Sequence, residues 1–271
     1  MKTEFWKYQG TGNDFVMINN YKSKIKHSPE LAQKLCDRHF GIGSDGLIIL
    51  EESLEADFKM VFYNPDGSQS FCGNGSRCAV QFAHKQRIIE QNTTRFLSTD
   101  GIHTAEIEST EVNLQMNAPL FLPLNFNDPV PHATQILLIN TGSPHLLVFL
   151  TNLDILQKMD IALVGSKIRY SKEFKREGVN VNFVAISRND EIYIRTYERG
   201  VEAETLSCGT GVTASAIAYH HLFNKKLGQN KVNVNAIGGK LKVTFKFESF
   251  KYKNIHLCGP AESVFHGHIN L

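Results

Sequence analysis

Short stretches in which apolar and polar residues alternate run along the whole chain, and this period-two pattern is typical of β-strands. We expect strands at residues 4–8, 15–18, 47–50, 58–63, 94–98, 102–108, 112–116, 136–140, 145–150, 181–187, 191–197, 231–236, 240–247 and 252–258. So many short strands with few helical patterns favour an α+β protein built from curled sheets.

Two longer segments rich in small and apolar residues predict helices at residues 76–89 and 212–223. The second has almost no polar face before His220, and a helix that is apolar nearly all round is buried. A third, peripheral helix is expected after Ser28, which can cap it, with Pro29 at its first position. The pattern therefore predicts one long buried helix in each half, wrapped by a sheet.

The sequence Cys-Gly-x-Gly occurs twice, at residues 72–75 and 208–211, each time between an expected strand and an expected helix. The two copies lie half a chain apart, which indicates two structural halves that each present one cysteine. We place the N-terminal half at residues 1–117, rejoined by 260–271, and the C-terminal half at residues 118–259.

The proline-rich segment 119–131 is the expected linker between the halves.

Charge and composition exclude several classes of protein. The 271 residues contain 29 Lys and Arg against 27 Asp and Glu, a balance that gives no support for binding to nucleic acid or to an anionic membrane surface. The apolar runs are too short to cross a bilayer, and the first residues lack a signal-peptide pattern, so we expect a cytoplasmic enzyme or binding protein.

The five cysteines are too few, and odd in number, for a disulfide framework. The sequence contains no Cys-x-x-Cys motif, which a structural zinc site would typically use. We expect Cys36, Cys78 and Cys258 to be buried apolar residues.

Cys72 and Cys208 have different surroundings, because each precedes a helix N-terminus. Unpaired backbone N–H groups and the helix dipole there stabilise a thiolate and bind a carboxylate. Two such units facing each other would hold one carboxylate between two helix ends, with a sulfur on each face of its α-carbon. One thiolate would remove the α-proton and the opposing thiol would return a proton to the other face, inverting the stereocentre. This chemistry needs no cofactor in principle.

The only match to a dinucleotide-binding glycine motif, residues 41–46, follows a helical pattern and precedes a strand, the reverse of the required order.

Several ordered motifs together resemble the diaminopimelate epimerase family, whose members are pyridoxal-independent. The motifs are Gly10–Phe15, Arg38–Gly46, Tyr63–Arg77, Gly142–His145, Gly178–Asn180 and Tyr197–Gly211. The resemblance covers almost the whole chain. It implies two similar domains, each a β-barrel-like sheet around a central helix, with the active site in the cleft between them.

The same resemblance implies the reaction: L,L-2,6-diaminopimelate is converted to the meso form, on the way to lysine and peptidoglycan precursors. It implies a small-molecule amino-acid substrate, no cofactor, no metal and a homodimer. Cys72 and Cys208 would be the acid/base pair, with His145 and Glu198 supporting catalysis beside them. The residues implied to bind substrate are Asn13, Asn64, Gly73, Asn74, Asn180, Glu198, Arg199, Gly209 and Thr210.

The residue types suit such a substrate, because an enzyme that acts on one end of it needs fixed polar groups for the other. Arg199 can bind a distal carboxylate through two hydrogen bonds. Two positions depart from the family pattern: Gly46 stands where glutamine is common, and Ser143 where asparagine is common. These departures leave open a related two-cysteine racemase that acts on proline, hydroxyproline or histidine. A non-catalytic binding protein and a redox sensor are further alternatives.

Overall fold

The computed structural model describes residues 2–22, 25–126, 128–188 and 190–271. The chain divides into two compact units. Unit 1 comprises residues 1–115 and 258–271, and unit 2 comprises residues 116–257. The described part of the proline-rich segment is not a linker, since it lies within unit 2, where Leu120–Phe121 form a strand and Phe126 is buried in the apolar core.

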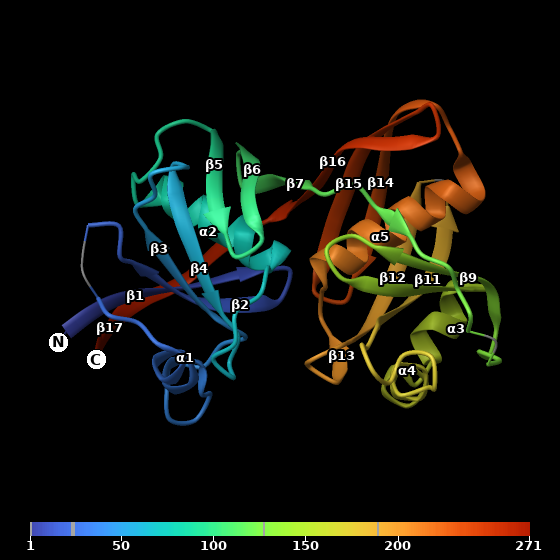
Figure 1. The fold of residues 1–271 in the computed structure, drawn as a ribbon, viewed down its shortest axis with the longest axis horizontal. Helices are drawn as coiled ribbons and strands as arrows, with labels where there is room; N and C mark the ends of the chain where they lie inside the picture. The colour runs from blue at the N-terminus through green and yellow to red at the C-terminus, as the bar shows by residue number, and fades with distance from the viewer. Residues whose placement is uncertain (1, 23–24, 127, 189) are drawn as a thin grey trace. The chain divides into compact units, whose positions relative to one another are not determined.

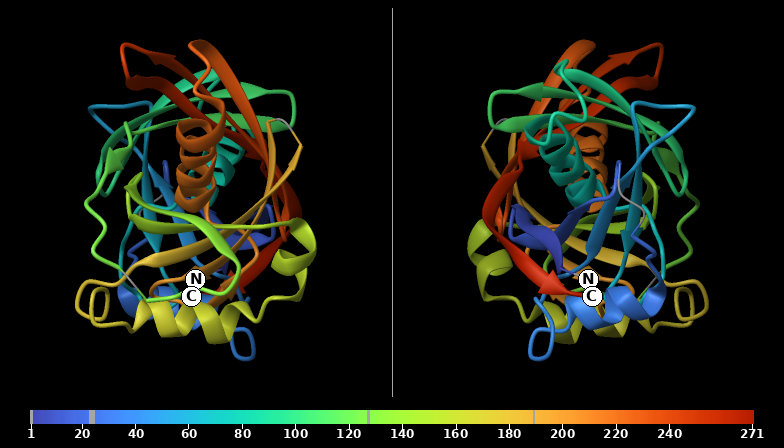
Figure 2. Two further views of the ribbon diagram at one scale, coloured as in Figure 1. Left: turned by 90° about the vertical axis from the view of Figure 1, so that its right-hand side faces the viewer. Right: turned by 90° about the vertical axis from the view of Figure 1, so that its left-hand side faces the viewer.

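The described residues of unit 1 form a mixed sheet with two helices. Its helices are α1 (Pro29–Cys36) and α2 (Gly73–Lys85), and its strands are β1 (Lys2–Gly10), β2 (Asn13–Asn19), β3 (Leu47–Glu51), β4 (Phe58–Tyr63), β5 (Thr93–Ser98), β6 (Gly101–Glu108), β7 (Glu111–Met116) and β17 (Glu262–Asn270). The strands pair in the order β17-β1-β2-β3-β4-β5-β6-β7, with β2–β3 and β4–β5 parallel and the other pairs antiparallel. Pairing of Lys2 with Asn270 brings the two ends of the chain side by side (Figure 2).

Helix α2 is enclosed by this sheet, because it contacts β1, β2, β3, β4, β6 and β17 (Figure 1). Helix α1 covers the other face, where Leu35 packs against Val16 and Leu47. Strand β3 is therefore buried on both faces, which explains why its sequence is an unbroken apolar run rather than an alternating one. At the start of α1, Ser28 accepts a hydrogen bond from Leu31 N (3.3 Å), as its sequence predicts.

Unit 2 repeats this plan. Its helices are α3 (Leu153–Lys158), α4 (Ile161–Arg169), α5 (Gly209–Tyr219) and the π-helix η1 (His220–Asn224), and its strands are β8 (Leu120–Phe121), β9 (Ala133–Asn140), β10 (Pro144–Leu150), β11 (Asn180–Arg188), β12 (Glu191–Glu198), β13 (Ala203–Thr205), β14 (Gly228–Ala236) and β15 (Gly239–Glu248). The strand β16 (Lys251–Pro260) leads from unit 2 back into unit 1. Helix α5 contacts β9, β10, β11, β12, β14 and β15, so it too is enclosed by its sheet (Figure 1).

The two sheets share one pattern of strand pairs. From β1 to β6 the successive pairs β1–β2, β2–β3, β3–β4, β4–β5 and β5–β6 are antiparallel, parallel, antiparallel, parallel and antiparallel. The pairs β9–β10, β10–β11, β11–β12, β12–β14 and β14–β15 repeat that series. In the order of the chain, each enclosed helix comes between the two strands of the second parallel pair. Helix α2 follows β4 and precedes β5, and helix α5 follows β12 and precedes β14. The prediction of two similar halves, each a curled sheet around one helix, is confirmed.

Some elements differ from the sequence-based expectation. Helices α2 and α5 begin three residues earlier than predicted, because the glycines of both Cys-Gly-x-Gly motifs form the first helical turns. The sequence also left α3, α4 and β17 unassigned. Asn152 and Asp160 cap α3 and α4 through Ile155 N (3.0 Å) and Leu163 N (2.9 Å), and these caps were the available local signals.

Candidate active site

Cys72 is the N-cap of α2, the enclosed helix of unit 1. Its backbone is extended and its Sγ accepts a hydrogen bond from Gly75 N (3.3 Å). Gly73 and Asn74 form the first helical positions after it. A sulfur held by a helix N-terminus is stabilised as a thiolate, since the N–H groups there lack intrahelical acceptors.

Asn13 reaches Cys72 from the turn between β1 and β2. Thr11 (φ 53°) and Gly12 (φ 84°) are both left-handed, which is the backbone of a two-residue hairpin turn, and Gly10 pairs with Asn13 across it. The Asn13 Oδ1 atom lies 3.9 Å from Cys72 Sγ and 3.3 Å from Asn74 Nδ2. The turn thus places the amide oxygen of Asn13 as an acceptor for the Cys72 thiol.

Asn64 follows β4 and is fixed by the turn that leads to Cys72. Its Nδ2 donates to Ser68 Oγ (3.0 Å) and Ser70 Oγ (3.2 Å). The amide side of Asn64 therefore faces its own loop, and its orientation is set before any ligand binds.

Cys208 occupies the same place at the N-terminus of α5, but its contacts differ. It has an extended backbone and its side chain makes no capping hydrogen bond. Its Sγ lies 3.5 Å from the hydroxyl of Thr210, two residues further on. Gly209 is the first helical residue, and Cys208 itself is 7% exposed.

Thr210 connects Cys208 to the fully buried His145. The Thr210 Oγ1 atom lies 2.9 Å from His145 Nε2, and His145 Nδ1 lies 2.8 Å from Asn182 Oδ1. Asn182 Nδ2 donates to Thr196 Oγ1 (2.7 Å), which leaves Asn182 Oδ1 as the acceptor for an Nδ1–H. His145 Nε2 is consequently the unprotonated nitrogen. Burial, with a smaller effect of the Arg199 charge, lowers the pKa of His145 to about 4, so this imidazole is neutral near pH 7.

Ser143 joins three of the predicted residues. Its Oγ lies 3.0 Å from His145 Nε2 and 3.2 Å from Thr210 Oγ1, and it accepts from Asn180 Nδ2 (3.0 Å). Asn180 Oδ1 in turn accepts from the backbone N–H of Arg199 (2.8 Å). The Ser143 hydroxyl is thus the centre of the polar network beside Cys208.

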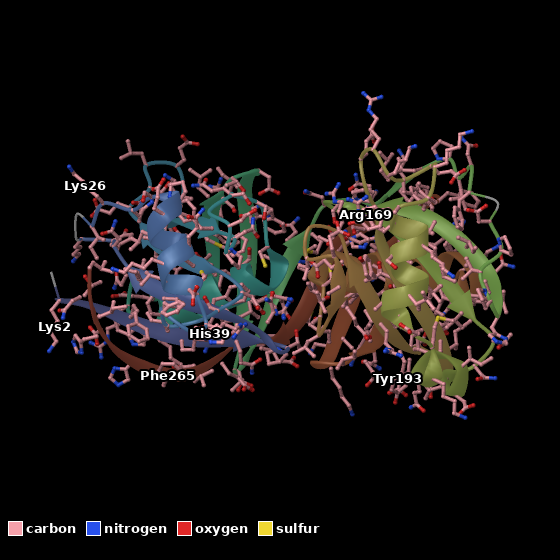
Figure 3. The ribbon with its side chains drawn as sticks, turned by 90° about the horizontal axis from the view of Figure 1, so that it is seen from below. Lys2, Lys26, His39, Arg169, Tyr193 and Phe265 are labelled. Carbon is pink, nitrogen blue, oxygen red and sulfur yellow. The ribbon has the colours of Figure 1, made fainter. Side chains whose placement is uncertain are left out.

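Arg199 and Glu198 lie at the end of β12. The Arg199 guanidinium donates to the backbone carbonyl of Glu177 (2.9 Å), and the side chain is exposed. The nearby Arg169, labelled in Figure 3, instead pairs with the carboxylate of Glu202 (3.2 Å). Glu198 accepts from the Thr205 hydroxyl (2.8 Å), which fixes one of its oxygens. The end of β12 thus presents one cation and one anion.

The absence of a side chain at residue 46 has a steric explanation. A Cβ added there would lie 2.3 Å from Cε2 of Phe62, a buried ring in β4. This position has no room for a larger side chain while Phe62 is present.

The structure thus brings Cys72, Asn13 and Asn74 together in unit 1. In unit 2 it brings Cys208, Thr210 and His145 together, linked through Ser143 to Asn180.

Sequence reasoning missed three contributors to these contacts: Asp45 and Arg77 in unit 1, and Asn182 in unit 2. Asp45 and Arg77 lie within motifs that the sequence singled out, whereas Asn182 had only its place in a strand as a signal. Within the described ranges, no three His, Cys, Asp or Glu side chains form a cluster that could hold a metal ion.

The whole chain matches known proteins. It matches the diaminopimelate epimerase family over residues 5–121 and 137–263. The chain belongs to the diaminopimelate epimerase family. The diaminopimelate epimerase of Flavobacterium psychrophilum is 49% identical over 265 residues, covering 97% of this chain and 98% of that protein. The enzyme of Aquifex aeolicus is 39% identical over 282 residues, covering 98% of each.

These matches confirm the family resemblance found in the motifs, and with it an isomerase that acts on a small-molecule substrate. Across the described residues, no helix combines the length and apolar character needed to span a membrane.

Solved structures share the fold of this family at low sequence identity. A phenazine biosynthesis protein of the PhzF family from Bacillus anthracis superimposes with a TM-score of 0.80 at 15% identity, over 100% of both chains. A probable proline racemase from Agrobacterium radiobacter gives a TM-score of 0.73 at 16% identity, over 99% of this chain and 93% of that one. At these identities the likeness shows the fold alone.

Proposed function

We propose that this chain interconverts L,L-2,6-diaminopimelate and meso-diaminopimelate by proton transfer at one α-carbon, with Cys72 and Cys208 on opposite faces of that carbon. The observation that carries the proposal is the repeated fold, in which each enclosed helix begins directly after a cysteine. A site that inverts a stereocentre needs an acid and a base of matched chemistry, and a duplicated cysteine at a helix N-terminus supplies them.

The reacting carboxylate binds to the two helix N-termini through backbone N–H groups of Gly73, Asn74, Gly209 and Thr210. One cysteine, as thiolate, takes the α-proton, and the electrons of the broken C–H bond move into the carboxylate. The helix N–H groups stabilise that negative charge. The second cysteine, as thiol, gives its proton to the opposite face of the carbon, and the two sulfurs exchange protonation states. No net oxidation or reduction occurs.

His145 supports this step as a neutral hydrogen-bond acceptor. Its unprotonated Nε2 lies 2.9 Å from Thr210 Oγ1, which lies 3.5 Å from Cys208 Sγ. The Thr210 hydroxyl can therefore donate to His145 Nε2 and turn its oxygen toward the Cys208 thiol. Glu198, held by Thr205, accepts from the α-ammonium group of the substrate.

The non-reacting end of the substrate binds to Arg199, Asn64 and Asn180. Arg199 forms the ion pair with the distal carboxylate, because its charge is not neutralised by Glu202, which pairs with Arg169. Asn180 holds the backbone of Arg199 through its Oδ1 (2.8 Å), which fixes where the guanidinium begins. Asn13 completes the set beside Cys72.

We further propose a cytoplasmic homodimer that uses no cofactor and no metal. Both reactive sulfurs must stay reduced, and none of the five cysteines forms a disulfide in the structure, which fits a reducing compartment. Light scattering at several protein concentrations tests the dimer: a mass of one chain, about 30.5 kDa, would exclude it.

The deciding experiment is proton NMR of the reduced protein with L,L-diaminopimelate in D₂O, without pyridoxal phosphate. We expect the α-proton signal to disappear while the meso isomer forms. Absence of exchange would reject the substrate. The same assay with proline, hydroxyproline and histidine would then identify a related racemase, the alternative that the departures at Gly46 and Ser143 leave open.

A further inference from the structure

In unit 1, a series of side chains that each donate a hydrogen bond to the next includes Asn13, the residue whose oxygen faces Cys72. Arg77 Nη1 donates to Asn74 Oδ1 (3.0 Å), and Asn74 Nδ2 donates to Asn13 Oδ1 (3.3 Å). Asn13 Nδ2 then donates to Asp45 Oδ2 (2.8 Å). Four side chains from α2, β2 and the loop before β3 thus form one continuous path.

The two ends of this chain fix its direction. Arg77 is a guanidinium, which only donates, and it is completely buried, where it also donates to Thr11 Oγ1 (3.3 Å). Asp45 is a carboxylate, which only accepts. An amide can turn over and exchange its oxygen and nitrogen at little cost, but between these ends only one orientation of Asn74 and Asn13 satisfies every group.

This orientation of the Asn13 amide decides which of its atoms faces the sulfur of Cys72. It points the oxygen of Asn13, rather than its NH₂ group, at the sulfur, 3.9 Å away. An oxygen there favours the protonated thiol, which can donate to it. Gly75 N, 3.3 Å from the same sulfur, favours the thiolate. Cys72 therefore has one partner for each protonation state, which suits a group that must act as base in one direction and acid in the other.

We propose that Asp45 is a positioning residue for catalysis: by holding the Asn13 amide, it sets the balance between thiol and thiolate at Cys72. The proposal rests on the proposed role of Cys72 as acid and base. In this proposal, Asp45 acts on Cys72 through Asn13. The Asp45 side chain is 44% exposed.

Other charged and titratable groups lie around this chain of hydrogen bonds. Within α2 these are Arg77 and Cys78. Beyond Asn13, the loop after α1 supplies Arg38, β2 supplies Asp14 and β1 supplies Lys7. Asp14 pairs with Lys7 Nζ (2.6 Å) and Arg38 Nη2 (2.9 Å). Despite its burial, hydrogen bonds from Lys7 and then Arg38 hold the pKa of Asp14 below its usual value, so this carboxylate stays charged.

The test compares Asp45→Ala with Arg38→Ala. Arg38 Nη2 also pairs with Asp45 (2.7 Å), but no described contact joins it to Asn13, so its removal loosens the ion network without freeing the amide. Asp45→Asn is the conservative variant, since its carbonyl can still accept from Asn13. Each purified variant is assayed for epimerisation and for alkylation of Cys72 by iodoacetamide as a function of pH. Peptide mass spectrometry separates Cys72 from Cys208, which serves as the internal reference.

In Asp45→Ala the Asn13 amide is held by Asn74 alone, so we expect it to turn in a fraction of the molecules and present its NH₂ group to the sulfur, which favours thiolate. The midpoint of the Cys72 alkylation profile should fall by at least half a pH unit, the Cys208 profile should not move, and kcat should drop about tenfold with KM little changed. Arg38→Ala should stay within about twofold of the parent, and Asp45→Asn should lie between.

An unmoved Cys72 profile with an unchanged kcat in Asp45→Ala would overturn the proposal, as would an equal effect of Arg38→Ala. Activity of the parent protein on diaminopimelate is measured in the same series. Failure of the parent to epimerise rejects the proposed function, whereas an active parent with an indifferent Asp45→Ala rejects only the positioning role.

Discussion

The two cysteine sites are built from equivalent parts that carry different chemistry. Cys72 and Cys208 both precede an enclosed helix with nearly the same backbone (φ −131° and −117°, ψ 111° in each). The sulfur of Cys72 caps its helix and faces an amide oxygen, whereas that of Cys208 makes no cap and faces a hydroxyl. Equal backbone geometry therefore does not make the two thiols equivalent.

The source of the difference is one turn in each unit. The β1–β2 turn carries Thr11-Gly12-Asn13, and the corresponding β9–β10 turn carries Thr141-Gly142-Ser143. Asn13 contacts the second residue after Cys72 (3.3 Å), and Ser143 contacts the second residue after Cys208 (3.2 Å). Asn13 donates to a carboxylate, however, while Ser143 accepts from an amide. The duplicated fold kept the positions and gave the two turns different hydrogen-bond partners.

The largest effect is expected when each of the two sulfurs is removed in turn. Cys72→Ala and Cys208→Ala should each lower epimerisation at least a thousandfold, because each face of the α-carbon needs its own acid or base. In D₂O, each variant should still exchange the α-proton of only one stereoisomer, and a different one in each. Proton NMR with separate isomers measures both effects and shows which cysteine serves which face. Near-normal turnover of either variant would refute the two-base mechanism.

The next test concerns the end of β12, where unit 2 presents Arg199. Arg199→Ala should lower kcat/KM for diaminopimelate by about 2 kcal/mol, roughly 30-fold, through loss of an ion pair with the distal carboxylate. Arg176→Ala, which removes an exposed arginine from the segment between α4 and β11, is the matched control and should have little effect. Steady-state kinetics decide the matter, and equal behaviour of the two variants would contradict the distal-end assignment.

A third test uses the neutral imidazole beside Cys208. Its pKa of about 4 lies below the unfolded value of about 6.5, so the unfolded chain binds the proton first. Stability should therefore fall as pH drops from about 6.5 toward 4, by up to about 3 kcal/mol from this group. His145→Gln should remove that component. Urea unfolding across the pH range measures it, and a parent–variant difference that is constant with pH would disprove it.

The smallest test compares the two cysteines as helix caps. Cys72 accepts from Gly75 N, whereas Cys208 makes no such bond, so Cys72→Ala should cost about 0.5 kcal/mol more stability than Cys208→Ala. Paired urea melts of the two variants measure this difference. A larger loss of stability in Cys208→Ala would show that the contact of Cys208 with the Thr210 hydroxyl contributes more than the cap made by Cys72.

Strands, enclosed helices and the repeated motif could be predicted from the sequence, because they depend on neighbours in the chain. Alternation of apolar residues identifies a strand, and a cysteine followed by two glycines identifies a helix start with room for a ligand. Ser28 and Pro29 marked α1 for the same local reason. Helices α3 and α4 were missed because they are short and the local signal for each is a single capping residue.

The sequence by itself determined the family, the duplication, and which two sulfurs stand before a helix. The tertiary structure alone decided what each sulfur faces. Asn13 meets Cys72 from 59 residues away, and Thr210 meets His145 from 65 residues away. Such contacts depend on the register of paired strands and on which atom of an amide or imidazole its far partner leaves available. A hydrogen bond has a direction and a length, and only the folded sheet fixes both.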